Sequence, residues 1–430
     1  MKCVRSVLCI CIQNIRKWTY DYRVWIIAAL LFFVCFDNSA SLGALARFYG
    51  VRSTLWYFPF AYMSFHIKII VTFPLVLLMC SAPFADANNL FIITRAGRTK
   101  WICGQLIYIT LASAIYYLFI FACSVVTAMP YAEFSNEWGG LLPTIAYNNQ
   151  ITSNIVRNNF IVVSGRVLRC FTPLSACWFT FLLSWLNGTV LGLIICACNV
   201  AFHRKYIGCG IAGFLIVLSG FFEQEGMGWY RYIRFSPVSW TTLDRVDVGG
   251  MTEYPSFLLL HSRVYCVDCD PFGFYHRTYP EQLAGKRGVL MNYSIEAEQV
   301  CKQFKDNLAL DNVDLKVESG SICGLVGRNG SGKTVLMKCI CGLMPLTSGK
   351  IIVNGKTIGR DVEIPKSVGV IIETPGFLNS FSAYSNLKFL ADISGKADKQ
   401  AIRAAIKSVG LDPDSKKHVG KYSLGMRQRL

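Results

Sequence analysis

A glycine-rich segment, GRNGSGKT, carries the clearest chemistry in this sequence. It fits the spacing G-x-x-x-x-G-K-[ST], in which glycines let backbone N–H groups approach phosphate oxygens. Lys333 is placed to reach the β- and γ-phosphates of a nucleotide, and the Thr334 hydroxyl can ligate Mg²⁺. We therefore predict ATP and Mg²⁺ as cofactors, bound by Gly327, Arg328, Asn329, Gly330, Ser331, Gly332, Lys333 and Thr334.

Two regular elements must hold this loop in place. The apolar run Ile322–Val326 predicts a β-strand before it, and Val335–Leu343 predicts a helix after it. The N-terminus of that helix adds its positive dipole to the phosphate site. Strand, loop and helix in this order are typical of a nucleotide-binding P-loop.

Around the loop, the stretch from Met291 to Leu430 resembles the ATPase subunits of ABC transporters. VCKQFKDNLALDNVDLKVESGSI resembles the family's opening β-hairpins, which implies that Phe304 stacks on adenine; a lone Phe is otherwise more often a core residue. GVIIETPGFLNSFSAYSNLKFL resembles the segment that couples the nucleotide to the permease, with Glu373 in place of the usual Gln. Such a Glu is familiar in the branch that resembles bacteriocin and lantibiotic exporters.

The last residues, KYSLGMRQRL, resemble the signature motif of the same family. The matching positions are Ser423, Gly425, Gln428 and Arg429, while Leu424 and Met426 replace the commoner Gly and Gln. In the family, this loop closes on the ATP held by the P-loop of a second subunit. The resemblance therefore implies a second nucleotide-binding domain as partner, in a homodimer or from a complete partner ATPase.

The family places its water-activating groups after the signature motif, beyond Leu430. These are the Walker B strand with its Asp and Glu, and the switch His. We therefore assign no catalytic residue and expect these 430 residues to bind ATP but to hydrolyse it orders of magnitude more slowly. Two alternatives stay open: a non-hydrolysing nucleotide-binding membrane subunit and an inactive fusion product.

The first part of the chain has the composition of a membrane protein. The whole sequence is 53% hydrophobic and 16% charged, with a mean hydropathy of +0.40. A bilayer span needs about 20 mostly apolar residues. Candidate spans are Val24–Phe36, Phe58–Ala82, Trp101–Ala128, Leu174–Ala201 and Tyr206–Phe222. The net charge of +17 does not indicate nucleic acid, because much of the Lys and Arg flanks these runs.

The basic clusters predict the orientation of the chain. Arg and Lys residues before the first run, after the second and after the fourth should lie in the cytoplasm. Val4–Ile15 is apolar but short, and is interpreted as an interfacial helix. Runs with short loops and basic clusters resemble an ABC-2 type permease. We expect a multi-pass protein of the cell membrane, in contact with lipid, with its nucleotide-binding domain in the cytoplasm.

Two polar features could be sites. His66 and Lys68 fall within the second apolar run, but a span that starts after Lys68 would let this side chain reach the interface, which we favour. Cys266 and Cys269 with His276 could be half of a zinc site. A fourth ligand at the usual spacing is absent, so we predict no metal there.

The predicted fold is a multi-span α-helical membrane domain plus an α/β P-loop NTPase domain that is truncated at its C-terminus. The membrane domain covers residues 1–260, with five clear spans and the remnant of a sixth. Residues 261–290 are an irregular junction, which suggests that a permease and an ATPase opening at Met291 have been joined. The expected function is ATP-driven export of a hydrophobic or peptide substrate, with an antimicrobial peptide or a drug as cargo.

Overall fold

The computed structural model describes residues 2–61, 63–85, 88–147, 162–223, 236–246, 293–305, 307–365, 368–371, 376–395 and 397–430. The chain falls into two compact units. One, here called the P-loop unit, comprises residues 1–13, 85–104 and 277–430. The other, here called the helical unit, comprises residues 14–84 and 105–276.

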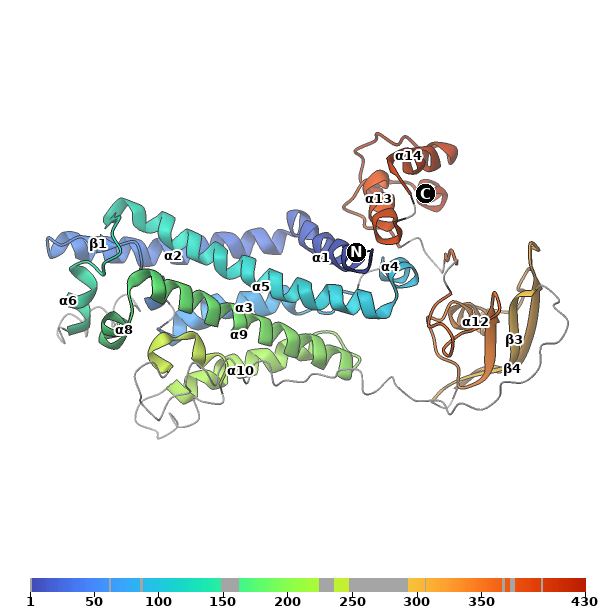
Figure 1. Ribbon diagram of the computed structural model, residues 1–430, viewed down its shortest axis with the longest axis horizontal. Helices are drawn as coiled ribbons and strands as arrows, with labels where there is room; N and C mark the ends of the chain where they lie inside the picture. The colour runs from blue at the N-terminus through green and yellow to red at the C-terminus, as the bar shows by residue number, and fades with distance from the viewer. Residues whose placement is uncertain are drawn as a thin grey trace. The chain divides into compact units, whose positions relative to one another are not determined.

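A helix forms within each of the five predicted spans, although in Phe58–Ala82 the α-helix covers only Phe65–Met79 (Figure 1). Three of these helices, Tyr22–Phe48, Arg98–Tyr131 and Pro173–Ala201, are long and apolar enough to cross a membrane, whereas Phe65–Met79 and Ile207–Phe222 are shorter. The full elements are α2 (Tyr22–Phe48), α3 (Phe65–Met79), α5 (Arg98–Ala128), α9 (Pro173–Ala201) and α10 (Ile207–Glu223).

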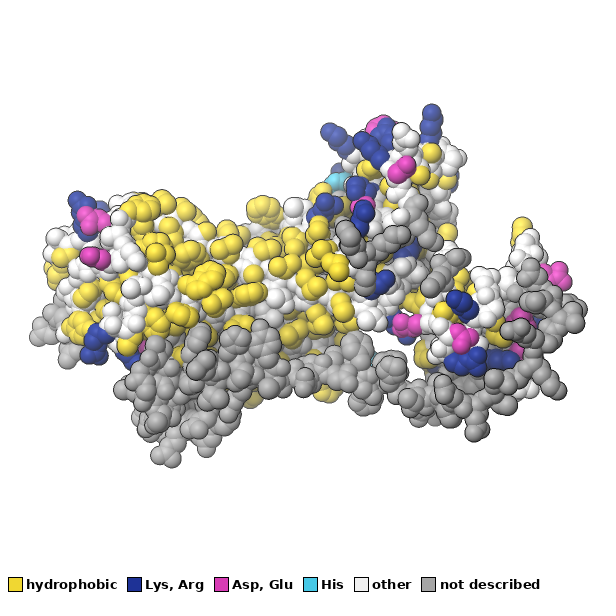
Figure 2. All heavy atoms as spheres, in the orientation of Figure 1, with side chains coloured by type: hydrophobic (Ala, Val, Ile, Leu, Met, Phe, Trp, Pro, Cys, Tyr) yellow, Lys and Arg dark blue, Asp and Glu magenta, His cyan; other side chains and the backbone are white. Residues whose placement is uncertain are grey.

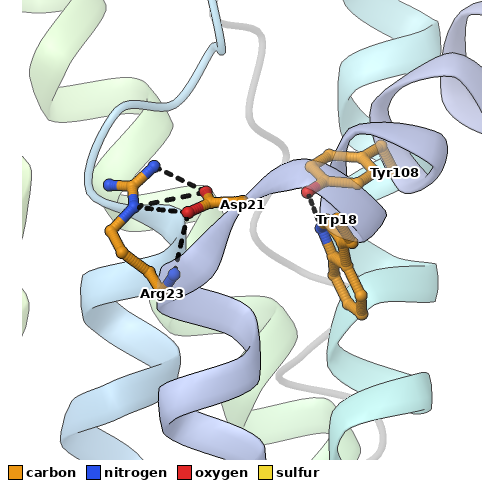
Figure 3. Close-up of polar contacts among 4 residues, drawn as sticks. All are labelled: Trp18, Asp21, Arg23 and Tyr108. Atoms are coloured by element: carbon orange, nitrogen blue, oxygen red, sulfur yellow. Dashed lines mark hydrogen bonds and ion pairs between the residues drawn. The ribbon is translucent and has the colours of Figure 1, made fainter. Parts of the chain in front are cut away.

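The first long helix begins at a capped turn (Figure 3). The Asp21 carboxylate accepts hydrogen bonds from the backbone N–H of Arg23 at 3.0 Å and from its guanidinium at 2.8 Å. Such a cap satisfies one of the N–H groups that a helix N-terminus leaves unpaired. Just before it, Trp18 Nε1 donates to the Tyr108 hydroxyl at 2.7 Å, which ties the start of α2 to α5.

Apolar side chains also cover the outside of the helical unit (Figure 2). On α2, Trp25 and Phe33 are 63% and 66% exposed, and Leu118 on α5 is 54% exposed. Water would penalise so much apolar surface, whereas lipid would not. The outer face of these helices therefore suits a bilayer.

Short elements close one end of the helical unit around a buried core. Leu42, Leu55, Phe60, Leu141 and Leu183 are among its buried residues. The short elements are β1 (Ser53–Thr54), η2 (Phe58–Phe60), η3 (Met129–Tyr131), β2 (Ala132–Glu133), α6 (Leu141–Tyr147), α8 (Gly165–Cys170), η5 (Ser239–Thr241) and η6 (Leu243–Arg245), with β1 and β2 paired in parallel. The turn η1 (Trp18–Tyr20) instead precedes the start of α2.

The prediction that Lys68 reaches the interface is wrong. Lys68 does lie in the first turn of α3, as expected, but its side chain is only 1% exposed. Its Nζ donates to the Thr242 hydroxyl at 2.9 Å. The segment that contains η5 and η6 covers this end of α3, so the ammonium finds a polar partner inside the unit rather than at a membrane surface.

The P-loop unit contains a four-stranded antiparallel sheet in the order β4-β3-β5-β6. Strands β3 (Tyr293–Phe304) and β4 (Asn307–Glu318) form the opening hairpin that the sequence predicts. Val300, Leu310 and Ile351 pack with Leu336 in a buried cluster beneath the P-loop helix. The other strands and helix here are β5 (Ser348–Val353), β6 (Lys356–Thr357) and α12 (Lys333–Ile340).

A second group of helices in this unit has its own core. It comprises α13 (Ala383–Ser394), α14 (Lys399–Ser408), η7 (Val419–Lys421) and α15 (Leu424–Arg429). Ile402, Ile406, Leu411 and Val419 are buried together between them. A third cluster joins α13 to two helices from the first part of the chain, α1 (Lys2–Lys17) and α4 (Asn89–Ala96). Val4–Ile15 is thus helical, while its place at a membrane interface stays a prediction.

The predicted strand Ile322–Val326 is not formed. Residues 321–328 have no regular structure, and Ile322 and Val326 are fully exposed. A strand needs neighbours for its N–H and C=O groups, and among the described residues no strand pairs with this segment. An apolar run alone therefore does not specify a strand.

Several predictions concern residues outside the described part of the chain. They are the junction at 261–290 with the remnant of a sixth span, the residues Cys266, Cys269 and His276, the start of the ATPase at Met291, and Glu373. The predicted domain boundaries stay predictions.

Candidate nucleotide-binding site

The P-loop runs directly into α12, which begins at Lys333. The preceding residue, Gly332, has a φ of +85° and occupies the N-cap position without a side chain to satisfy the first N–H groups of the helix. Those N–H groups point out of the helix end and form a natural anion site. The prediction of a helix at Val335–Leu343 is confirmed, with the helix starting earlier and ending at Ile340.

At Gly332, backbone from another strand leaves no room for a side chain. A Cβ there would lie 2.4 Å from the Ala309 carbonyl oxygen and 2.9 Å from the Leu310 side chain. This close approach sets the loop against β4. Gly330 has the same φ of +85°, yet a Cβ there would meet nothing within 4 Å. Both positions therefore favour glycine because of their positive φ, and Gly332 also requires it because there is no space for a Cβ.

The Lys333 ammonium lies against its own loop. Its Nζ donates to the Gly327 carbonyl at 2.6 Å and to the Arg328 carbonyl at 2.7 Å. Both acceptors come from the start of the loop, so the side chain crosses the loop and keeps its charge beside the α12 N-terminus. Phosphate oxygens at this position would compete for the same donor. Thr334 follows on α12 and is exposed, so its hydroxyl is accessible to a metal ion.

Phe304 is the last residue of β3, where the hairpin turns into β4. It pairs with Asn307, two residues before Ala309, the residue that touches the loop at Gly332. Its ring is 42% exposed and has the Lys302 ammonium 5.1 Å from its centroid. Phe304 is therefore an accessible aromatic side chain rather than a core residue, which is the property that its predicted adenine-stacking role requires.

The signature residues lie in the other helical group. Ser423 caps α15, since its Oγ accepts a hydrogen bond from the Met426 N–H at 3.3 Å. Leu424 is 69% exposed, and Gly425 and Gln428 are exposed as well. Met426 packs on the cluster formed by α13, α14 and α15, not on the one beneath the P-loop. The two predicted parts of the site thus belong to different cores.

Sequence reasoning missed a contact at the far end of the P-loop helix. Arg98, the first residue of α5, donates from Nη2 to the carbonyls of Gly342 and Leu343 at 3.0 and 3.1 Å. Its Nη1 is 3.3 Å from the Glu363 carboxylate. The basic residues in this stretch were interpreted only as orientation signals. A positive charge suits this place, because carbonyl groups near a helix C-terminus are partly negative.

The short helix α4 was also missed. Phe91 and Ile92 are buried with Phe389 and Leu390 of α13, and the Phe91 ring stacks on Phe377 with centroids 6.2 Å apart. At the N-terminus of the chain, the Ser6 hydroxyl donates to the Ile393 carbonyl at 3.0 Å. The signal that could have found α4 is its apolar pattern, NLFII, before the chain reverses at Gly97.

Comparison with known proteins agrees with the P-loop geometry. Residues 310–430 match the family described as "ABC transporter". The chain is 42% identical over 136 residues to the uncharacterized ABC transporter ATP-binding protein YybJ of Bacillus subtilis, covering 32% of this chain and 62% of that protein. It is 38% identical over 143 residues to the bacitracin transport ATP-binding protein BcrA of Enterococcus faecalis, covering 33% and 46% respectively.

A lantibiotic transport protein is similar too. The lantibiotic transport ATP-binding protein SrtF of Streptococcus pyogenes is 34% identical over 137 residues, which cover 32% of this chain and 58% of that protein. The chain thus spans between about half and three-fifths of the length of these relatives.

Proposed function

We propose, from the match of residues 310–430 to the ABC transporter family, that the chain binds MgATP at its P-loop to drive export through its helical unit. One observation carries the proposal. The same chain holds a glycine loop shaped against β4, with a lysine across it, and three helices long and apolar enough to cross a membrane. A nucleotide-binding domain and membrane-spanning helices in one polypeptide are the parts that a transporter needs.

The site residues have distinct parts in this proposal. The loop N–H groups and Lys333 bind the phosphates, and the Thr334 hydroxyl is a ligand for the magnesium ion that accompanies them. Phe304 offers its ring to adenine. The signature residues Ser423–Gln428 bind the ATP held by a second nucleotide-binding domain. Their exposure leaves them accessible to another subunit.

Contacts within the P-loop unit support coupling between ATP binding and export. Arg98, the first residue of α5, donates hydrogen bonds to carbonyls just beyond the C-terminus of α12. The N-terminus of the same helix would face the phosphates. The α4 helix packs on α13 through apolar side chains. Rigid packed elements of this kind transmit small displacements. Movement at the P-loop would therefore reach the start of α5.

The helical unit is proposed to cross the cell membrane several times, with the P-loop unit in the cytoplasm. The exposed apolar faces of α2 and α5 support this placement, as do the flanking basic residues. The cargo is proposed to be an antimicrobial peptide or another hydrophobic compound. The printed functions of two similar proteins, bacitracin transport and lantibiotic transport, support a peptide.

Nucleotide binding is tested with the full chain in lipid nanodiscs and a fluorescent ATP analogue. Lys333→Ala removes the ammonium that reaches the phosphates, and we expect an affinity loss of about 30-fold or more, equivalent to about 2 kcal/mol. Lys356→Ala, on the exposed strand β6, is the control and should bind like the wild type. Equal affinities of the wild type and Lys333→Ala would refute a P-loop role.

Export is tested separately. Inside-out vesicles that contain the chain and a complete partner ATPase should accumulate radiolabelled bacitracin when ATP is added. Lys333→Ala in this chain should lower the rate. Vesicles that accumulate no bacitracin, although the chain binds the ATP analogue, would argue against peptide export while leaving nucleotide binding intact.

A further inference from the structure

Buried polar side chains line up inside the helical unit on three of its helices. Every one of them is at most 3% exposed. They are Thr72 on α3, Ser113 and Tyr117 on α5, and Thr180, Ser184 and Asn187 on α9, here called the polar seam. The outer surface of the helical unit is apolar, yet its interior carries these polar groups. Buried polar groups of this kind need an explanation.

Helix periodicity places these residues on facing surfaces. Residues three or four positions apart share one helix face, which is the spacing within α9 and within α5. A Cβ at Gly188 would lie 2.8 Å from Leu75 on α3, 2.9 Å from Tyr117 and 3.2 Å from the Ser113 hydroxyl. The three helices therefore meet closely at Gly188, next to Asn187.

A second contact gives the direction of packing. A Cβ at Gly192 would lie 2.6 Å from Ile109 on α5 and 2.6 Å from Met79 on α3. Going from Gly192 to Gly188 on α9 thus moves from Met79 to Leu75 on α3, so residue numbers fall together and the two helices run parallel. Continuing one and two turns along α9, to Ser184 and Thr180, leads to the level of Thr72 and then of Lys68 on α3. The seam therefore ends at the buried Lys68 and its partner Thr242.

Several seam atoms have no hydrogen-bond partner among the described residues. They are the hydroxyls of Ser113, Thr180 and Ser184. Other hydroxyls on the same helices behave differently. Thr110 donates to the Leu106 carbonyl at 3.1 Å and Thr189 to the Trp185 carbonyl at 2.9 Å, each within its own helix. Thr110 and Thr189, which lie outside the seam, thus bond back to their own helices, whereas the hydroxyls of Ser113, Thr180 and Ser184 remain available.

We propose that the polar seam binds the amide groups of a peptide inside the helical unit. A peptide amide has one donor and one acceptor, and the Asn187 side chain offers both in return. Ser113, Thr180 and Ser184 can each donate or accept, so they match a chain that presents both kinds of group in succession. Apolar walls such as Leu75 and Ile109 would contact the peptide's side chains. This inference rests on the proposed function and names the part of the cargo that is recognised.

Binding of radiolabelled bacitracin to the full chain in nanodiscs tests the proposal. The wild type should bind it saturably. Asn187→Leu keeps the approximate volume but removes both hydrogen-bonding atoms, and we expect an affinity loss of about tenfold or more. Thr180→Val and Ser184→Ala should each lose about threefold to tenfold. The thermal unfolding midpoints of the last two should stay level or rise, because each variant removes a buried group without a partner.

Thr110→Val and Thr189→Val are the matched controls, since their hydroxyls bond within their own helices. Both should bind bacitracin like the wild type. Wild-type affinity in all three seam variants would overturn the proposal, as would a uniform loss that includes the controls. A wild-type chain that binds the fluorescent ATP analogue but no bacitracin would also overturn it, while leaving the nucleotide site standing. A chain that binds neither would overturn both.

Discussion

The P-loop and the polar seam place their polar groups in opposite ways. In the P-loop, neighbouring residues supply the chemistry, and Lys333 bonds to carbonyls of its own loop. In the seam, the groups come from three helices, and several have no partner among the described residues. A site made of consecutive residues is visible in the sequence, whereas a site assembled from distant helices becomes visible only when the helices pack.

The largest expected effect concerns the shape of the P-loop. Gly332→Ala and Gly330→Ala both put a side chain on a residue with a φ of +85°, which costs about 1–2 kcal/mol. Only Gly332→Ala also collides with the Ala309 carbonyl. We expect Gly332→Ala to abolish measurable binding of the ATP analogue and Gly330→Ala to weaken it. Equal affinities of the two variants would show that contact with β4 does not shape the site.

A smaller effect is expected at the other end of the P-loop helix. Arg98→Ala removes two donors to the Gly342 and Leu343 carbonyls and the ion pair with Glu363. The side chain is partly exposed, so we expect a loss of about 1 kcal/mol in the unfolding free energy. Arg360→Ala, whose partner is the adjacent Asp361, is the control and should leave stability unchanged. Urea denaturation in detergent measures both.

A comparison of two serine N-caps can distinguish a purely structural role of Ser423 from a role in binding ATP. Ser382 and Ser423 each accept a hydrogen bond from a backbone N–H at 3.3 Å, at the starts of α13 and α15. Replacing either by Ala should cost about 1 kcal/mol of stability. If Ser423 also binds the ATP of a second subunit, Ser423→Ala alone should reduce ATP-dependent dimerisation, measured by light scattering. Equal dimerisation of both variants would assign Ser423 a capping role only.

The smallest effect is expected at the surface of α14. A hydrogen bond from Arg403 lowers the pKa of the Asp414 carboxyl, and both side chains are exposed. A lowered pKa stabilises the folded state above the ordinary carboxyl pKa, and this contribution disappears as the pH falls through the lowered value. Arg403→Gln should return the pKa of Asp414 towards its ordinary value, as measured by NMR titration, with little change in stability at neutral pH.

Much of the fold could be predicted, because hydrophobic periodicity and turn residues act locally. The apolar runs became α2, α3, α5, α9 and α10, and the opening hairpin became β3 and β4. The two wrong predictions concern segments whose structure depends on contacts with distant residues. Ile322–Val326 has the composition of a strand but no neighbour to pair with among the described residues. Lys68 has the position of a residue that reaches the interface, but packing buries it against Thr242.

The sequence by itself predicted a P-loop and a signature segment, and it determined the helical character of the five apolar runs. Each depends on residue types at fixed short spacing, which local backbone geometry turns into structure. Only the tertiary structure decided that Gly332 must be glycine, that Arg98 bonds beyond the end of α12, and that Gly188, next to Asn187, meets Ser113 and Tyr117. These facts depend on close contacts between segments far apart in the chain, which no local pattern encodes.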